Sequence, residues 1–342
     1  AWIVKAWTCS ASPSLSRSAR RWSILGLAGL LGVAPIAAFA ALGSPRNEAI
    51  AFGISMVVIS GFWKLVELAC RTGPKGFDVS FRQWMVYCGA PGEVALDAEG
   101  RIQQAPPGLL GECLRSLLGH WCLFLAFLIV GDLTDFVPGL PRGSDPASMP
   151  LFGFPWSVPA LFLQTWTFYC FLQSILQFWR VVLALTGIAT EVPFRQPMLL
   201  STCIRDFWGR RWNLLIHRMM KRSVFTPCAK RMGPRLAAFA AFMASALFHE
   251  YMWVVTNWRD MNYMPGGPLL FFLLQFVFCT AEELLRATPL GRLAGALPGP
   301  AKTALTLLVP MPFAGLFLQG VFAGGVVPSM AVLLPRVVLT TS

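Results

Sequence analysis

The sequence predicts an all-α, polytopic transmembrane helix bundle of about seven to nine spans, with an interfacial amphipathic helix, from three observations. Of the 342 residues, 56% are hydrophobic and only 13% are charged, whereas a soluble chain carries roughly 25% charged residues. Apolar runs of ~20 residues, the length that crosses the hydrocarbon of a bilayer, recur along the chain. Lys and Arg gather on one side of the layout that these runs define.

The apolar runs place the expected membrane spans. Runs of suitable length cover 22–43, 49–70, 113–137, 156–186, 236–257, 267–285 and 303–325. The fourth run is long enough for a strongly tilted helix or for a helix with a re-entrant piece. The stretches 89–108 and 138–155 contain Pro and Gly and are expected to be loops.

Basic residues predict the orientation. In this layout 1–21, 71–112, 187–235 and 286–302 lie on one side of the membrane and carry 21 Lys and Arg, while the opposite side carries three. Because basic loops stay in the cytosol, the N-terminus and 187–235 are predicted to be cytosolic.

Residues 1–21 are predicted to be a basic N-terminal flank, and 22–342 a single membrane-embedded domain. The flank has four basic residues, five serines and no acid, so a transit peptide is the alternative interpretation. The net charge of +12 favours anionic membrane partners over nucleic acid, because a nucleic-acid binder would be soluble and far richer in Lys and Arg.

The nine cysteines form no C-x-x-C pair, so neither a zinc ribbon nor a thioredoxin-type site is supported.

The segment 205–235 concentrates the basic charge, with nine Lys and Arg and one acid. At helical spacing it has an apolar stripe of Trp208, Trp212, Leu215, Ile216 and Met219, and a polar stripe of Asp206, Arg210, Asn213, His217 and Lys221. This pattern predicts a helix in the membrane interface with tryptophans at headgroup depth. The helix is either an anchor on anionic lipid or a platform for a phosphorylated ligand such as coenzyme A. The predicted substrate-binding residues of the platform are Trp208, Arg210, Arg211 and Trp212.

Two ionisable residues, His249 and Glu250, lie deep in the predicted span 236–257. Ionisable side chains are costly inside a membrane, so such positions indicate function. Ser245 lies one turn before His249 on the same helix face, and neutral His is the usual base for a hydroxyl proton. The alternative is a His–Glu pair that only ties two helices together. Trp253 occupies the place of the second His of an H-E-x-x-H zinc motif, and neither a G-x-S-x-G elbow nor a Walker loop occurs.

Two motifs resemble a known family. Residues 205–213, RDFWGRRWN, are similar to the [R/Q]DFWGRRWN signature of plant wax synthases. Residues 242–251, FMASALFHEY, are similar to the FxxSAxxHEY motif of the membrane-bound O-acyltransferase (MBOAT) superfamily. The first motif favours the wax synthase-like (long-chain-alcohol O-fatty-acyltransferase) branch, whereas SALFHEY is closer to the diacylglycerol and sterol acyltransferases.

The resemblance implies an enzyme of lipid metabolism in the endoplasmic reticulum, which transfers a fatty acyl group from acyl-CoA to the hydroxyl of a lipid alcohol. Wax ester synthesis is the first expectation, and a diacylglycerol or sterol acceptor is the alternative. His249 matches the catalytic base and Asn213 the second polar residue of the active site. Glu250 is expected to orient His249, and Ser245 to bind substrate. The expected partners are acyl-CoA, the alcohol and membrane lipids, with no metal or other cofactor.

Two functions of another class stay open as alternatives. A membrane transporter would line a polar path with His249–Glu250, Lys64–Glu67 and Glu282–Glu283. A non-catalytic lipid-binding protein would keep the motifs without turnover.

The acyltransferase interpretation requires Asn213 and His249 to lie close together. His249 lies 14 residues past Arg235, or ~21 Å along a helix. The segment 195–222 must therefore dip into the bundle to bring Asn213 toward His249.

Overall fold

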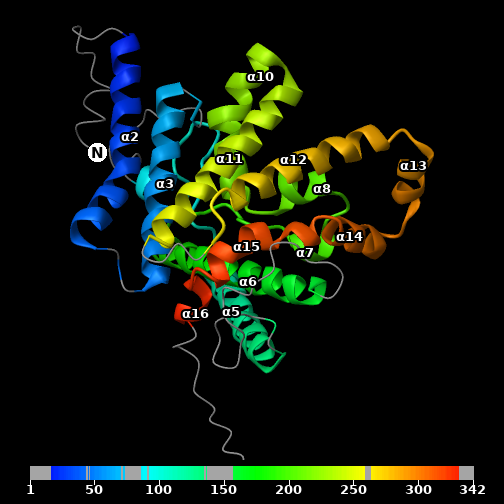
Figure 1. Cartoon of the computed structure of the whole chain (residues 1–342). Coiled ribbons are helices and arrows are strands. Elements are labelled where there is room, and N and C mark those ends of the chain that lie inside the picture. The colour runs from blue at the N-terminus through cyan, green and yellow to red at the C-terminus, as the bar shows by residue number, and fades with distance from the viewer. Residues whose placement is uncertain are drawn as a thin grey trace, which may run out of the picture.

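The predicted fold class is confirmed by the computed structural model, which describes residues 17–43, 45, 47–70, 72–73, 86–90, 92–134, 136, 157–258 and 263–330. These residues form an α-helical bundle (Figure 1). Among them, β-structure is limited to isolated bridges within 94–104 and from there to 188–190. Residues 1–16, most of the predicted basic flank, lie outside the described part of the chain.

The first four long helices follow the predicted spans to within a few residues. They are α2 (Arg17–Leu42), α3 (Glu48–Cys70), α5 (Leu109–Thr134) and α6 (Val158–Leu185). Helices α2 and α3 lie side by side at the left of Figure 1, and α5 packs along α6. Large apolar side chains such as Leu30, Leu118 and Leu133 stay 60% to 70% exposed on the outer faces of α2 and α5. Such surfaces suit lipid rather than water, as in an integral, multi-pass membrane protein.

Residues 197–232, which include most of the basic segment 205–235, form a series of short pieces and not one interfacial helix. They are α7 (Pro197–Leu200), α8 (Ile204–Asp206), η2 (Phe207–Arg211), α9 (Leu214–Met220), η3 (Lys221–Phe225) and α10 (Thr226–Met232). The left-handed backbone of Asn213, with φ of 38°, interrupts the predicted stripe and starts a new helix. Leu215, Ile216 and Met219 of that stripe are buried in the main apolar core, and Trp212 packs against it. This segment therefore enters the bundle.

Helices α11 (Pro234–Thr256) and α12 (Gly267–Leu285) form the next hairpin, and their bounds match two predicted spans. Pro234 stands at the first position of α11, where its missing N–H costs nothing. Phe239 and Phe242 of α11 both contact Phe276 of α12. Contacts of this kind continue toward the other end of α11, so the two helices run antiparallel.

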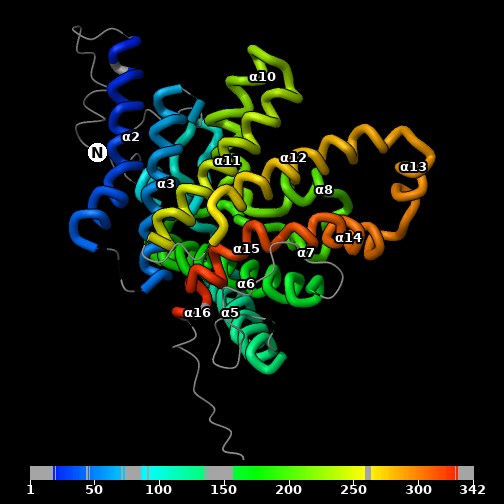
Figure 2. Tube along the Cα trace, in the orientation of Figure 1, coloured from blue at the N-terminus to red at the C-terminus, as the bar shows by residue number. Residues whose placement is uncertain are grey.

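The chain then turns at α13 (Pro289–Ala296) and returns as α14 (Gly299–Leu308), η4 (Met311–Phe313), α15 (Gly315–Phe322) and α16 (Val326–Met330), a path that Figure 2 follows from orange to red. The predicted span 303–325 is bent, because 299–313 and 315–322 meet at 70°. Among the described residues, six helices are long and apolar enough to cross a membrane, or seven if this bent pair is one span.

A cluster of charged side chains lies between α3, residues 86–90 and 92–93, and η3. Glu67, 1% exposed, accepts hydrogen bonds from the Tyr87 hydroxyl (2.7 Å) and from Arg222 Nε (3.1 Å). Arg222 Nη1 also donates to Glu93 (2.7 Å), and Lys64 Nζ donates to the Tyr87 carbonyl (2.5 Å). Burial, with the neighbouring Glu67 carboxylate, raises the pKa of the Tyr87 hydroxyl, which therefore stays a donor. The opposite charges compensate one another and fix η3 to α3.

Candidate active site

A large cavity lies within the bundle, with a volume of about 1050 Å³. Its walls come from α3, α6, the segment 198–221, α11, α12 and residues 306–318. His249 and Asn213, the two predicted active-site residues, both line it. The structure thus brings into one cavity two residues that lie in separate motifs.

His249 is held in one tautomer by its own helix. Its Nδ1 lies 2.7 Å from the Ser245 carbonyl oxygen. Because a carbonyl oxygen only accepts, Nδ1 carries the proton and Nε2 keeps its lone pair. Nε2 makes no hydrogen bond to the residues that the structure describes. Ser245 itself is buried in the cavity wall.

Three aromatic rings enclose the His249 imidazole. Phe272 of α12 stacks on it with ring centroids 4.6 Å apart and an interplanar angle of 21°. Phe248 and Phe317 meet it edge-on, at 4.8 Å and 5.1 Å. The rings come from α11, α12 and α15, so the packing of three helices determines the orientation of this imidazole.

Asn213 combines a backbone role with a free donor. Asn tolerates the left-handed conformation better than most residues, and this position has φ of 38° and ψ of 64°. Its Oδ1 accepts from Ile216 N (3.4 Å) and caps α9. Its Nδ2 group has no partner among the described residues, so its N–H donors are available to a ligand in the cavity.

The indole of Trp208 is positioned by a residue that the sequence analysis missed. Trp208 Nε1 donates to Gln275 Oε1 (3.1 Å), and both side chains line the cavity. Gln275 has no exposed surface, and its Nε2 has no partner in the described part of the chain. A lone glutamine within the apolar run 267–278 was the available signal, because uncompensated polar groups in spans are costly. Trp212 also lines the cavity, stacked on Phe207 with centroids 5.2 Å apart.

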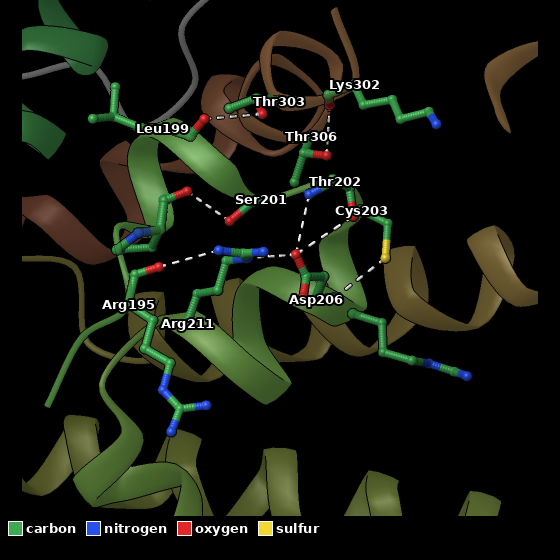
Figure 3. A network of polar contacts seen from close by, with 12 residues as sticks. Arg195, Leu199, Ser201, Thr202, Cys203, Asp206, Arg211, Lys302, Thr303 and Thr306 are labelled. Atoms are coloured by element: carbon green, nitrogen blue, oxygen red, sulfur yellow. Dashed lines mark hydrogen bonds and ion pairs between the residues drawn. The ribbon is translucent and has the colours of Figure 1, made fainter. Parts of the chain in front are cut away.

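The two arginines of the predicted platform lie outside the cavity wall. Arg211 Nε donates to Asp206 Oδ2 (2.6 Å) and Nη1 donates to the Arg195 carbonyl (3.3 Å), as Figure 3 shows. Thr202 N also donates to Asp206 (3.2 Å). Arg210 is exposed. The assignment of Arg210 and Arg211 to coenzyme A binding stays a prediction, but Arg211 already pairs with the Asp206 carboxylate.

Other cations do line the cavity, at the end that includes the start of α11. They are Arg205, Lys221 and Arg235. Arg205 forms an ion pair with Glu283. Lys221 and Arg235 are exposed and form no ion pair with the described residues. The cavity therefore joins a basic rim to an apolar interior that contains His249.

Of the charged pairs that a transporter would need, His249 and Glu283 line the cavity, but their partners Glu250 and Glu282 do not. Lys64 and Glu67 belong to the charged cluster at η3 and do not line the cavity. Glu282 accepts from Ile204 N (2.8 Å) at the far end of α12. Glu250 accepts from Gly266 N (2.8 Å) and has no hydrogen bond to His249. These groups serve separate local contacts.

The chain matches known proteins in the region that builds much of this cavity. Residues 192–274 match the Membrane bound O-acyl transferase family. The chain is 32% identical over 110 residues to acyl-CoA--sterol O-acyltransferase 1 of Arabidopsis thaliana, which covers 30% of each chain. It is 33% identical over 138 residues to probable long-chain-alcohol O-fatty-acyltransferase 3 of the same plant, 37% of this chain and 39% of that one. It is 31% identical over 121 residues to diacylglycerol O-acyltransferase 1, also of Arabidopsis thaliana, 34% of this chain and 22% of that one.

These matches span between 22% and 39% of each relative's length. The relatives are named for three different acceptors, so the matches support the shared chemistry more than one alcohol. Both motifs lie inside the matched region. The predicted resemblance to the membrane-bound O-acyltransferases, and to their wax synthase-like members, is thereby confirmed over this region of the multi-pass membrane protein.

Proposed function

We propose that this protein transfers a fatty acyl group from acyl-CoA to the hydroxyl of a lipid alcohol, with wax ester synthesis as the first candidate. One observation carries the proposal: a single cavity joins the rim cations Lys221 and Arg235 to His249. Acyl-CoA needs such a shape, because its phosphates favour basic groups and its acyl chain favours an apolar interior.

His249 is the proposed general base. With Nδ1 engaged by the Ser245 carbonyl, Nε2 is the atom that takes the alcohol proton as the alcohol oxygen attacks the thioester carbonyl carbon. The carbon–sulfur bond then breaks, and the proton on Nε2 passes to the coenzyme A sulfur. The products are the ester and free coenzyme A. A thioester is already activated, so no covalent enzyme intermediate and no metal are needed.

Asn213 is the proposed donor to the thioester carbonyl oxygen. Its Oδ1 is engaged by Ile216 N, which leaves the Nδ2 N–H groups for a ligand in the cavity. A donor suits an oxygen on which negative charge develops during attack.

The charge distribution supports a cytosolic entrance for acyl-CoA. Lys221 and Arg235 belong to 187–235, the most basic loop of the chain, and basic loops remain in the cytosol. By the same rule the N-terminus is cytosolic. The family resemblance makes the endoplasmic reticulum the proposed membrane.

Two kinds of alternative hypothesis remain, one on the identity of the acceptor alcohol and one on whether the protein is catalytic. Diacylglycerol and sterols are the alternative alcohols, since relatives named for both match this chain. A non-catalytic lipid-binding protein is the alternative of another class, and it would hold acyl-CoA without consuming it.

The test uses cells that lack their own neutral-lipid acyltransferases. Membranes containing the full chain receive labelled acyl-CoA with a fatty alcohol, a diacylglycerol or a sterol, and the esters are separated and quantified. We expect wax esters, and ~10²–10⁴-fold slower ester formation by membranes with an equal amount of the His249→Ala variant. If the protein is present in the membrane and no ester forms with any of the three acceptors, the proposed function is contradicted. A preference for diacylglycerol or sterol would correct the acceptor.

A further inference from the structure

Glu250 follows His249 in the motif, yet its carboxylate contacts a different helix. Glu250 Oε1 accepts from the backbone N–H of Gly266 (2.8 Å) and from the Tyr263 hydroxyl (3.4 Å). Both donors belong to the turn that begins α12. Burial, with the neighbouring Glu250 carboxylate, raises the pKa of the Tyr263 hydroxyl, so this group stays a donor. The expected contact with His249 is replaced by one across the hairpin.

No side chain of α12 itself caps this end of the helix. Its N-cap residue is Gly266, with φ of 83° and no side chain, and its first turn contains no acid. The first N–H groups of a helix lack partners and carry partial positive charge. The other Glu250 oxygen, Oε2, is buried without a partner among the described residues, so no cation of the described chain competes for this carboxylate. Glu250 thus supplies from α11 the anion that α12 lacks.

The same end of α12 rests against the backbone of α15. A Cβ atom on Gly267 would lie 2.5 Å from the Leu316 carbonyl oxygen. The two helices therefore approach as closely as glycine permits. A shift at the start of α12 would also move α15.

These two helices supply two of the three rings around His249. Phe272 lies five residues past Gly267, or ~8 Å along α12, and stacks on the imidazole. Phe317 follows Leu316 directly and meets the imidazole edge-on. The turn that Glu250 fixes is therefore connected to both rings by short, rigid segments.

We infer that Glu250 is a positioning residue for His249: its carboxylate caps α12 and so holds Phe272 and Phe317 against the imidazole. This inference rests on the proposed function for the role of His249, and adds how the base keeps its orientation. Glu250 itself does not touch the reacting atoms.

The first test compares two substitutions of Glu250. In Glu250→Ala the cap is lost, and we expect kcat to fall about tenfold while KM for acyl-CoA changes less than about twofold, because a misplaced base slows the reacting complex. In Glu250→Gln the amide oxygen still accepts from Gly266 N–H, so kcat should fall only about twofold. Equal loss in both variants would overturn the inference, since it would mean that a hydrogen-bond acceptor on Gly266 N–H is not enough to hold the rings against the imidazole.

The second test is a double-mutant cycle with Phe272→Leu. If Glu250 acts through Phe272, the loss of kcat in Glu250→Ala/Phe272→Leu should be clearly smaller than the product of the two single losses. Phe278→Leu is the matched control, because Phe278 packs against Phe313 and does not line the cavity. Its effect should multiply with that of Glu250→Ala. Independent effects of Glu250 and Phe272 would overturn the inference.

A third measurement is independent of activity. Hydrogen exchange of the protein in lipid nanodiscs should speed up at 264–270 in Glu250→Ala and change little in Glu250→Gln, because only the first loses the cap. Unchanged exchange in Glu250→Ala would overturn the inference. If the wild-type protein formed no ester, the proposed function would fail, and the exchange measurement would still decide whether Glu250 caps α12.

Discussion

The two motif segments place their polar side chains in different ways. In 205–213 most polar groups are used by the fold itself: Asp206 pairs with Arg211, and Trp208 bonds Gln275. In 242–251 the chain is a regular helix, and His249 keeps Nε2 free within the cavity. The first segment mainly builds the wall of the cavity, and the second presents the reactive group. Matching a motif therefore identifies a site without saying which of its residues meet the ligand.

The irregular backbone of the first segment explains why Asp206 pairs with Arg211. Trp212 N donates to the Phe207 carbonyl (2.8 Å), five residues back, as in a π-helix. Asp206 and Arg211 are also five residues apart, so they come to the same face and form the ion pair. In an α-helix a five-residue step would separate them by ~140° around the axis, and Arg210 would lie beside Asp206 instead.

The largest expected effect comes from the regular segment. His249→Ala should lower the rate of acyl transfer by ~10²–10⁴-fold, the usual contribution of a general base. His120→Ala is the matched control, because His120 Nδ1 also bonds a carbonyl four residues back, that of Ser116 (2.7 Å), but His120 does not line the cavity. Rates are compared at equal amounts of protein in the membrane. Near-normal transfer by the His249 variant would remove this residue from the mechanism.

A smaller effect, on stability, is expected in the irregular segment. Asp206→Asn should lower the free energy of unfolding by about 2 kcal/mol, because Arg211 is then left partly buried without its opposite charge. Arg210→Gln changes the neighbouring charge at an exposed position and should have little effect on stability. Thermal unfolding of both variants in nanodiscs measures the difference. Equal stability of the two variants would mean that the π-turn does not depend on this ion pair.

The sequence alone was sufficient where the backbone is regular. The spans 49–70 and 267–285 were predicted to within one residue, and His249 was singled out because helical spacing and span depth follow directly from residue number. The broken segment could not be predicted, because a helical wheel assumes an α-helix throughout. The pairs Trp208–Gln275 and Glu250–Gly266 were also missed, since they join residues 67 and 16 positions apart through the packing of α12.

The smallest expected effect separates the two sets of cations. Lys221 lines the cavity and is exposed at its rim without an ion pair among the described residues, whereas Arg210 is exposed outside the cavity wall. Lys221→Gln should raise KM for acyl-CoA about fivefold, the loss of roughly one charge-assisted contact to a phosphate, and leave kcat within about twofold. Arg210→Gln removes one positive charge from the same segment, so it controls for the overall potential. If instead Arg210→Gln raises KM and Lys221→Gln does not, the phosphates bind the platform outside the cavity. Acyl-CoA would then reach His249 by a route other than the basic rim.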